Sequence, residues 1–236
     1  NPCASLRLQQ IADSYGLKLI YDAAHAFGVT IDGHSLLEQG DLAIVSFHAT
    51  KVFNTFEGGA IVCHDAKLKQ RIDYLKNFGF ADEVTVVAPG INGKMSEFQA
   101  ALGLLQLNYV DQVIAARLAI DRRYREALAE VPGVTCLAKA EGVRPNGGYF
   151  PILVGPDYPL SRDQLYDRYR SNDIHVRRYF HPLISDLPMY HRIASAAPAG
   201  LPVAATIARQ VLCLPIYADL DKQTVERVIQ IIASAW

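Results

Sequence analysis

The sequence lacks the features that mark several common classes of protein. Its 236 residues carry 23 basic and 24 acidic side chains and a formal net charge of −1, so they offer no positive excess with which to bind nucleic acid. No apolar run approaches the roughly 18 residues of a membrane-spanning helix, and we expect no signal peptide. Half of the residues are hydrophobic, which is typical of a soluble globular chain with one large or two small domains.

The chain also has few cysteines. Its four, Cys3, Cys63, Cys136 and Cys213, lie far apart, and none has the short spacing to another that is typical of a metal site. We therefore expect no metal, and we interpret the cysteines as reduced structural thiols of a cytoplasmic protein. A metal-binding or thiol-based role is the least favoured functional hypothesis.

The first half of the chain alternates helical and strand patterns. Apolar residues recur at helical spacing over residues 5–15, Gly16 ends this helix, and the apolar run 17–21 is typical of a buried strand. Further strands are predicted at 42–47 and 59–63. A helix that leads directly into a short apolar strand favours an α/β fold with a parallel sheet.

Capping residues predict two more helices in this half. Asp65 is a candidate N-cap for a helix that runs to about residue 77. Residues 78–94 are rich in glycine and turn-forming pairs, which indicates a loop. Ser96 then precedes a helical pattern that continues to about residue 129, before Pro132 and Gly133. This single predicted helix is long enough to connect two domains.

The second half has the character of a separate α+β module, with half-buried strands and short helices. The predicted strands are 134–137, 149–154, 174–177 and 211–214, the predicted helices are 161–170, 204–210 and 222–234, and 182–202 is a proline-rich loop. No internal repeat or low-complexity segment is present.

Two polar residues follow predicted strands of the first half. Asp22 closes the run 17–21, and Lys51 lies in the turn after the run 42–47. In open α/β sheets, ligands bind beyond the carboxyl ends of the strands, so both side chains are well placed for a ligand. A carboxylate hydrogen-bonds the protonated pyridine nitrogen of pyridoxal phosphate, and a lysine forms a Schiff base with its aldehyde. We hypothesise that Asp22 and Lys51 hold this cofactor between them.

Other polar residues near these strand ends fit the same cofactor. Ser46 and Thr50 are candidates for contact with a phosphate, and His25 is close enough to Asp22 in the sequence to reach the ring or its hydroxyl. Each residue also has a simpler explanation. An aspartate after a strand is commonly a turn residue, a loop lysine is usually solvated, and a single histidine is often part of the core or of a turn.

Four stretches carry a resemblance to a known family: YDAAHAFG at 21–28, SFHATK at 46–51, EGGA at 57–60 and GINGKMSE at 90–97. In order and spacing they resemble the DegT/DnrJ/EryC1/StrS family of sugar aminotransferases, and the likeness runs along essentially the whole chain. The resemblance implies fold type I of the pyridoxal-phosphate-dependent transferases, which is the aspartate aminotransferase architecture. It also implies pyridoxal 5'-phosphate as cofactor and a homodimer whose active sites lie between subunits.

The resemblance assigns roles to single residues. Lys51 matches the Schiff-base lysine, Asp22 matches the partner of the pyridinium nitrogen, and His25 stands where the family places Gln or His against the ring. Ser46 matches the serine that contacts the phosphate. Asn92 matches the asparagine that reaches the phosphate of the neighbouring subunit. Relatives with His in place of the lysine act as dehydratases, so Lys51 favours transamination.

Two stretches narrow the resemblance to one branch of the family. FHATKVFNT at 47–55 and RRYFHPL at 177–183 resemble the enzymes that aminate a dTDP-4-keto-6-deoxyhexose at C4. Arg177, Arg178 and Tyr179 are therefore candidates for substrate binding, because arginine suits planar anions such as a diphosphate or a carboxylate. The alternative is that both arginines are surface residues of a strand.

The resemblance predicts transfer of an amino group from glutamate to a nucleotide sugar, in the biosynthesis of deoxyaminosugars such as those of lipopolysaccharide O-antigen. A C3-aminotransferase, another enzyme of fold type I, and a truncated non-catalytic remnant or interaction module remain open as alternatives. Residues 1–115 are expected to be the C-terminal portion of the large cofactor domain, and residues 116–236 a linking helix and the small domain. The chain begins without methionine. Because family members are normally longer there, we expect an N-terminal portion with a phosphate-binding loop and an aromatic that stacks on the cofactor ring.

Overall fold

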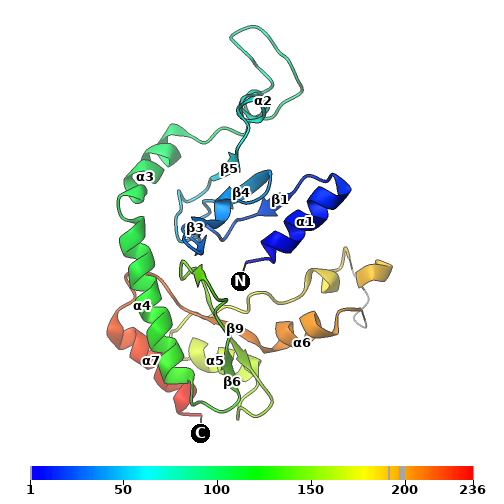
Figure 1. The fold of residues 1–236 in the computed structure, drawn as a ribbon. Coiled ribbons are helices and arrows are strands. Elements are labelled where there is room, and N and C mark those ends of the chain that lie inside the picture. Colours follow the sequence, from blue (N-terminus) through cyan, green and yellow to red (C-terminus); the bar gives the residue numbers. More distant parts are fainter. Residues whose placement is uncertain (1, 191, 197–199, 236) are drawn as a thin grey trace. The chain divides into compact units, whose positions relative to one another are not determined.

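The computed structural model describes residues 2–190, 192–196 and 200–235 (Figure 1). The chain divides into two compact units. The first comprises Asn1–Ile114 together with Lys139–Asn146, and the second comprises Ala115–Ala138 together with Gly147–Trp236. The later segment joins the first unit because strand β7 (Val143–Arg144) pairs with strand β2 (Thr30–Ile31).

A three-stranded sheet forms the first unit's centre, in the order β1 (Ile20–Asp22), β4 (Leu42–Ser46), β5 (Gly59–Cys63). Strands β1 and β4 are parallel, as predicted, whereas β4 and β5 are antiparallel. The prediction of a parallel sheet is therefore wrong for its third strand. The connection 47–58 contains no helix that could carry the chain across the sheet, so it returns the chain directly alongside β4.

Helices α1 (Ser5–Tyr15), α2 (Ala66–Lys76) and α3 (Glu97–Leu107) complete this unit with the small strand β3 (His34–Ser35) and the 3₁₀ turn η1 (Leu36–Glu38). Their ends confirm the predicted caps. Gly16 closes α1 in the left-handed conformation, at φ 62°, and Asp65 accepts the Leu68 N–H at the start of α2. Ser96 and Gln99 form a reciprocal capping box that starts α3.

The long helix predicted from residue 96 to about residue 129 is in fact two helices. Helix α3 ends at Leu107, and α4 (Val110–Leu128) follows it. At the break, the Asn108 side-chain amide donates to the carbonyls of Leu104 and Leu105, both at 3.3 Å. A side chain that takes the carbonyls of the last turn competes with the backbone N–H groups that would otherwise continue the helix.

The first unit leaves many apolar side chains exposed. Helix α1 buries only Ala12, while Leu6 and Tyr15 are 83% and 76% exposed. Strands β1 and β5 are the two edges of their sheet, and Ile20 and Ile61 on them are also exposed. Within the described residues, neither edge has a partner strand on its outer side.

The second unit is built on an antiparallel sheet in the order β6 (Val134–Cys136), β8 (Phe150–Val154), β9 (Val211–Leu214). Its helices are the part of α4 from Ala115 onward, α5 (Arg162–Arg170), α6 (Pro202–Gln210) and α7 (Lys222–Ala233), with 3₁₀ turns η2 (Ile184–Asp186) and η3 (Ala194–Ala196). The strand predicted at 174–177 is wrong, because only Arg177 pairs, in an isolated bridge with Cys213. Residues 191 and 197–199 of the predicted proline-rich loop lie outside the described part.

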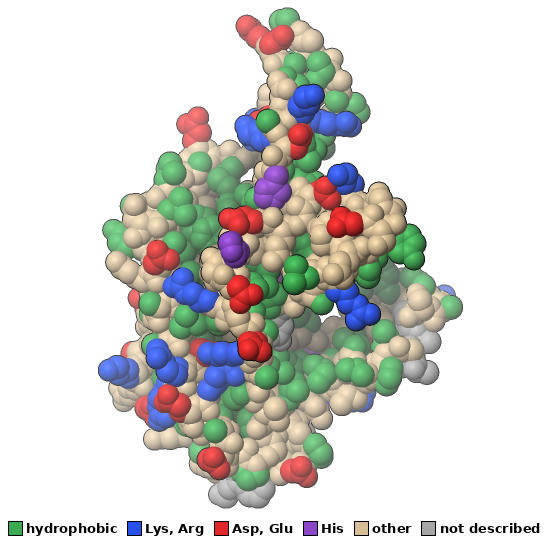
Figure 2. All heavy atoms as spheres, in the orientation of Figure 1, with side chains coloured by type: hydrophobic (Ala, Val, Ile, Leu, Met, Phe, Trp, Pro, Cys, Tyr) green, Lys and Arg blue, Asp and Glu red, His purple; other side chains and the backbone are tan. Residues whose placement is uncertain are grey.

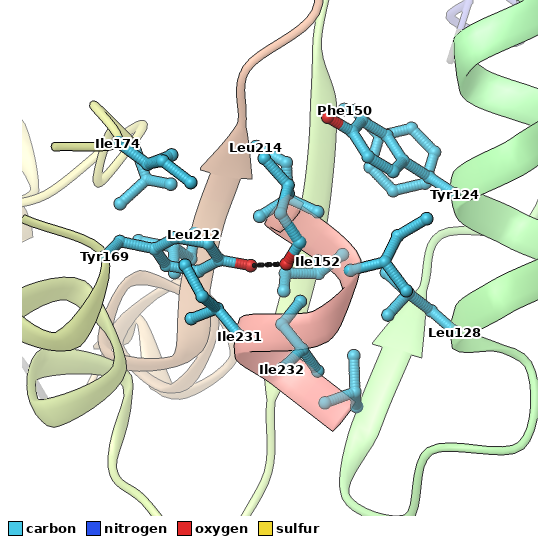
Figure 3. Packing of buried hydrophobic residues seen from close by; sticks show 14 of the residues in the cluster. Tyr124, Leu128, Phe150, Ile152, Tyr169, Ile174, Leu212, Leu214, Ile231 and Ile232 are labelled. Atoms are coloured by element: carbon cyan, nitrogen blue, oxygen red, sulfur yellow. Dashed lines mark hydrogen bonds between the residues drawn. The ribbon is translucent and has the colours of Figure 1, made fainter. Parts of the chain in front are cut away.

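Large side chains from the sheet and from α4, α5 and α7 fill the core of the second unit (Figure 3). Tyr124, Phe150 and Tyr169 are almost fully buried around Ile152 and Leu212. The hydroxyl of Tyr169 donates to the carbonyl of Val228 at 2.8 Å, so its polar end is satisfied inside the core. Burial raises the pKa of Tyr169 well above its ordinary value. Each such side chain contributes about 1.5–3 kcal/mol through burial of apolar surface.

No helix in the described ranges combines the length and apolar character that crossing a membrane requires.

Candidate active site

The first unit brings Lys51 and His25 into contact near the end of β1. Lys51 Nζ lies 3.4 Å from His25 Nδ1 and 3.3 Å from His25 Nε2. Near-equal distances to both ring nitrogens place the amine over the face of the imidazole, because an in-plane atom at these distances would collide with Cε1. Asp22, the last residue of β1, lies near enough to both groups to influence their pKa values.

Three phenylalanines join the turn that carries His25 to the connection that carries Lys51. Phe27 stacks on Phe53 with ring centroids 4.4 Å apart, and Phe47 meets Phe53 edge-on at 4.9 Å. Aromatic pairs in these geometries contribute about 0.5–1.5 kcal/mol each beyond the area that they bury. The trio explains why two segments that are distant in sequence hold their polar side chains together.

The turn that carries His25 is also held by hydrogen bonds from a residue that sequence reasoning missed. The buried Asn146 donates its side-chain amide to the carbonyls of His25 and Phe27, both at 2.9 Å. Asn146 lies 121 residues after His25, and its Pro-Asn-Gly context reads locally as an ordinary turn. Only the tertiary structure reveals this support.

The electrostatics of the site favour uncharged nitrogen groups. Burial lowers the pKa of Lys51 from its ordinary 10.5, and the carboxylate of Asp22 opposes that change. Burial and the charge of Lys51 lower the pKa of His25 from 6.5, again against Asp22. At neutral pH His25 is therefore mostly neutral, and Lys51 presents more free amine than a solvated lysine does. A free amine is the nucleophilic form.

Replacing Asp22 with asparagine is expected to lower the pKa of Lys51 further. The carboxylate is the group that stabilises the ammonium form, so its loss leaves burial unopposed. Competitive acetylation of the chain across a pH series, read by mass spectrometry of the Lys51 peptide, gives this pKa. The exposed Asp13, changed to asparagine in the same way, is the control. An unchanged or raised pKa of Lys51 in the Asp22 variant would contradict this explanation.

Ser46 lies at the carboxyl end of β4, beside Gly59 of β5. Its Oγ accepts the backbone N–H of His48 at 3.3 Å, which leaves its own O–H group to donate. Asp22 and His25 both line a hollow of about 250 Å³ that also reaches Tyr21 and Gln39. The end of this sheet thus combines a carboxylate, an imidazole, an amine and a hydroxyl.

The structure does not bring Asn92 to these residues. Asn92 pairs with Asn77 through the backbone, and its side-chain oxygen accepts from Lys94 Nζ at 2.9 Å. It lines a different hollow, of about 650 Å³, to which neither Asp22 nor Lys51 contributes. Its predicted contact with the cofactor of a neighbouring subunit stays a prediction.

The three predicted substrate-binding residues belong to the second unit. The Arg178 guanidinium lies 3.6 Å from the Tyr166 ring centroid, and its Nε is 2.7 Å from an Asp163 oxygen, so it already has partners. Arg177 is exposed. Tyr179 meets Tyr149 edge-on at 5.5 Å. Whether these residues contact a substrate stays a prediction.

No group of three His, Cys, Asp or Glu side chains in the described part of the chain could hold a metal ion. The four cysteines are free thiols, and Cys213 is the most buried of them.

Comparison with known proteins adds an independent line of argument. Residues 1–233 match the DegT/DnrJ/EryC1/StrS aminotransferase family. A dTDP-4-amino-4,6-dideoxy-D-glucose transaminase from Escherichia coli is 48% identical over 233 residues, which is 98% of this chain and 62% of that protein. A transaminase of the same name from Shigella dysenteriae is 46% identical over 98% of this chain and 63% of its own length.

A solved structure of DesI in the presence of its TDP-sugar product superposes on 99% of this chain with a TM-score of 0.89 and 37% identity. This chain covers 59% of that protein, and it spans less than two thirds of the length of the curated relatives above. The likeness confirms the predicted aminotransferase fold over the part that is covered. Because the family match extends over nearly all of its residues, the chain belongs to the DegT/DnrJ/EryC1/StrS aminotransferase family.

Proposed function

We propose that this chain acts in a pyridoxal-phosphate-dependent aminotransferase that moves an amino group from glutamate to C4 of a dTDP-linked 4-keto-6-deoxy sugar. The proposal places the enzyme in the cytoplasm, on a route to deoxyaminosugars such as those of lipopolysaccharide O-antigen. The names of the two transaminase relatives and the TDP-sugar product of DesI support the substrate class. The observation that carries the proposal is the placement of the Lys51 amine over His25 beside Asp22.

The chemistry of these side chains fits pyridoxal phosphate. A lysine of lowered pKa can attach an aldehyde, and a carboxylate at a strand end can hold a protonated pyridine nitrogen. Under the proposal Lys51 and Asp22 would hold the cofactor at its two ends, His25 would lie against its ring, and Ser46 would donate to its phosphate. Asn92 would contribute from a second subunit.

When bound, pyridoxal phosphate supplies an electron sink for the carbon that loses a proton. Lys51 would act at both halves of the reaction as the general acid and base. Its Nζ would accept the α-proton of glutamate in the first half and deliver a proton to C4 of the sugar in the second half. A lowered pKa suits this work, because the same nitrogen must take and release a proton near neutral pH. Asp22 would keep the site from lowering that pKa too far.

A panel of nucleotide sugars tests the substrate. With glutamate as donor, we expect amination of a dTDP-4-keto-6-deoxyhexose and little amination of a 3-keto isomer, measured by chromatography and mass spectrometry of the product. The C4 preference follows the relatives at 46% and 48% identity, whereas a dTDP-3-amino-3,4,6-trideoxy-glucose transaminase from Streptomyces venezuelae is 30% identical. Preferential amination of the 3-keto sugar would support the C3 alternative instead.

The proposed homodimer finds support in the surface of α3. Phe98, Leu104 and Leu105 on this helix are 74%, 69% and 57% exposed, and Figure 2 shows hydrophobic side chains gathered in this region of the first unit. Several large apolar side chains exposed on one helix commonly mark a protein interface. On the same helix, Gly103 faces inward. A Cβ atom added at this residue would lie only 3.1 Å from Cγ2 of Thr55.

Replacing Leu104 with aspartate is therefore expected to convert a dimer into a monomer, because a buried unpaired carboxylate at an interface is strongly unfavourable. Light scattering on a sizing column measures the mass. Val203, which is 74% exposed on α6, is the matched apolar position, and its change to aspartate should leave the mass unchanged. A monomeric parent chain, or a Leu104 variant that stays dimeric, would refute this interface.

A further inference from the structure

The connection that carries Lys51 is held together by side chains as well as by backbone hydrogen bonds. The N–H of Phe47 donates to Gly58, and the N–H of Thr55 donates to Phe47. The almost fully buried Thr55 donates its hydroxyl to the carbonyl of Glu57 at 2.6 Å. These contacts fix the base of the loop, but they lie away from the turn that presents Lys51.

His48 supplies the contacts at that turn. Its carbonyl accepts the N–H of Lys51 at 2.9 Å, and its ring Nδ1 accepts the N–H of Thr50 at 3.2 Å. The Thr50 hydroxyl lies 2.9 Å from the same nitrogen. The backbone carbonyl and the ring of His48 therefore hold the backbone of Thr50 and of Lys51, whose side chain carries the amine.

The contact requires one tautomer of the ring. A nitrogen that accepts an N–H carries no proton, so the neutral ring has its proton on Nε2. Nε2 faces a carboxylate oxygen of Glu57 at 3.7 Å, and a negative charge there suits a proton on that nitrogen. In the opposite tautomer the ring N–H would donate to the Thr50 hydroxyl, and the backbone N–H of Thr50 would lose its acceptor.

We propose that His48 is a positioning residue, whose Nδ1 holds the turn at Thr50 and so keeps the Lys51 amine over His25, with Glu57 selecting the tautomer. The inference rests on the proposed function for its catalytic consequence. The contact itself is a property of the chain alone. His48 acts through Lys51 and touches neither substrate nor cofactor in this scheme.

Two amide substitutions separate this role from general stability. Asparagine at position 48 places an acceptor oxygen near the site of Nδ1, where it can still receive the Thr50 N–H as in an Asx turn. Glutamine places its amide near the site of Nε2 and leaves Thr50 without that acceptor. The two variants are matched in polarity and differ in which ring nitrogen they imitate.

In the ¹⁵N-labelled chain without cofactor, the amide of Thr50 should exchange with solvent about five- to tenfold faster in His48→Gln than in the parent, as expected for the loss of one hydrogen bond. In His48→Asn the exchange rate should stay close to the parent's. Competitive acetylation across a pH series should show that the pKa of Lys51 rises toward that of a solvated lysine in His48→Gln. In His48→Asn this pKa should be unchanged. Equal exchange in both variants, or lost protection with an unchanged pKa of Lys51, would overturn the proposal.

These readouts need no cofactor, so they stand apart from the proposed function. If the parent chain fails to capture pyridoxal phosphate while the two variants differ as described, the aminotransferase proposal fails and the positioning role survives. If the parent captures the cofactor at Lys51 and the variants behave alike, the positioning role fails alone.

Discussion

Replacing Lys51 with alanine is expected to lower the rate of glutamate-dependent amination by roughly 10⁴-fold or more, because under the proposed function one nitrogen would supply both covalent attachment and proton transfer. Covalent capture of pyridoxal phosphate at this position should vanish with the amine. The fold should survive, since burial already disfavours the charged form of the amine. Steady-state kinetics with dTDP-4-keto-6-deoxyhexose and glutamate measure the loss.

A matched lysine separates chemistry from charge. Lys67 is exposed on α2, and its change to alanine removes the same atoms from the first unit. We expect near-parent rates for Lys67→Ala. A Lys51 variant that kept more than about a hundredth of the parent rate would show that another group does the proton transfer, because general acid–base catalysis alone contributes about 10²–10⁴-fold.

Replacing Arg162 with alanine is expected to lower the free energy of unfolding of the second unit by about 3 kcal/mol or more. The Arg162 side chain is only 4% exposed. Its Nη1 donates to the carbonyls of Ala208 and Val211 at 3.0 and 3.1 Å, and its Nε donates to Asp163 at 2.8 Å. The substitution leaves two buried carbonyls, where α6 meets β9, without a hydrogen-bond donor. Each such unsatisfied group lowers stability by about 1–3 kcal/mol.

Urea unfolding followed by circular dichroism measures this change. Arg170, exposed at the end of the same helix, provides the control, and Arg170→Ala should alter stability by about 0.5 kcal/mol at most. Equal destabilisation by the two substitutions would mean that the buried hydrogen bonds of Arg162 do not stabilise the junction of α6 and β9.

Much of the local structure follows directly from the sequence. Gly16, Asp65, Ser96 and Ser161 each have a capping chemistry that acts within a few residues, and each lies at a helix end in the structure. The two strands predicted at 17–21 and 42–47 end within one residue of β1 and β4, because a short apolar run followed by polar residues is a local pattern, although β1 begins only at Ile20.

The structural features that the sequence did not predict depend on tertiary interactions, which local sequence patterns do not contain. The direction of β5 is set by the lack of a crossover helix between it and β4, and the end of α3 is set by a side-chain amide that takes two carbonyls. The apolar spacing of the run after Ser96 continues past that break, so periodicity alone predicts one helix. Asn146 contacts the site from 121 residues away, and His48 differs from any loop histidine only in what its ring nitrogen accepts.

The central claim is that the Lys51 amine is the group that takes up the cofactor. Its most direct test is to mix the chain with pyridoxal phosphate, reduce with borohydride, digest, and locate the modified lysine by mass spectrometry. The account predicts the pyridoxyl group on Lys51, with exposed lysines such as Lys67 and Lys94 modified only to a minor extent. Modification spread evenly over surface lysines, with no preference for Lys51, would contradict it.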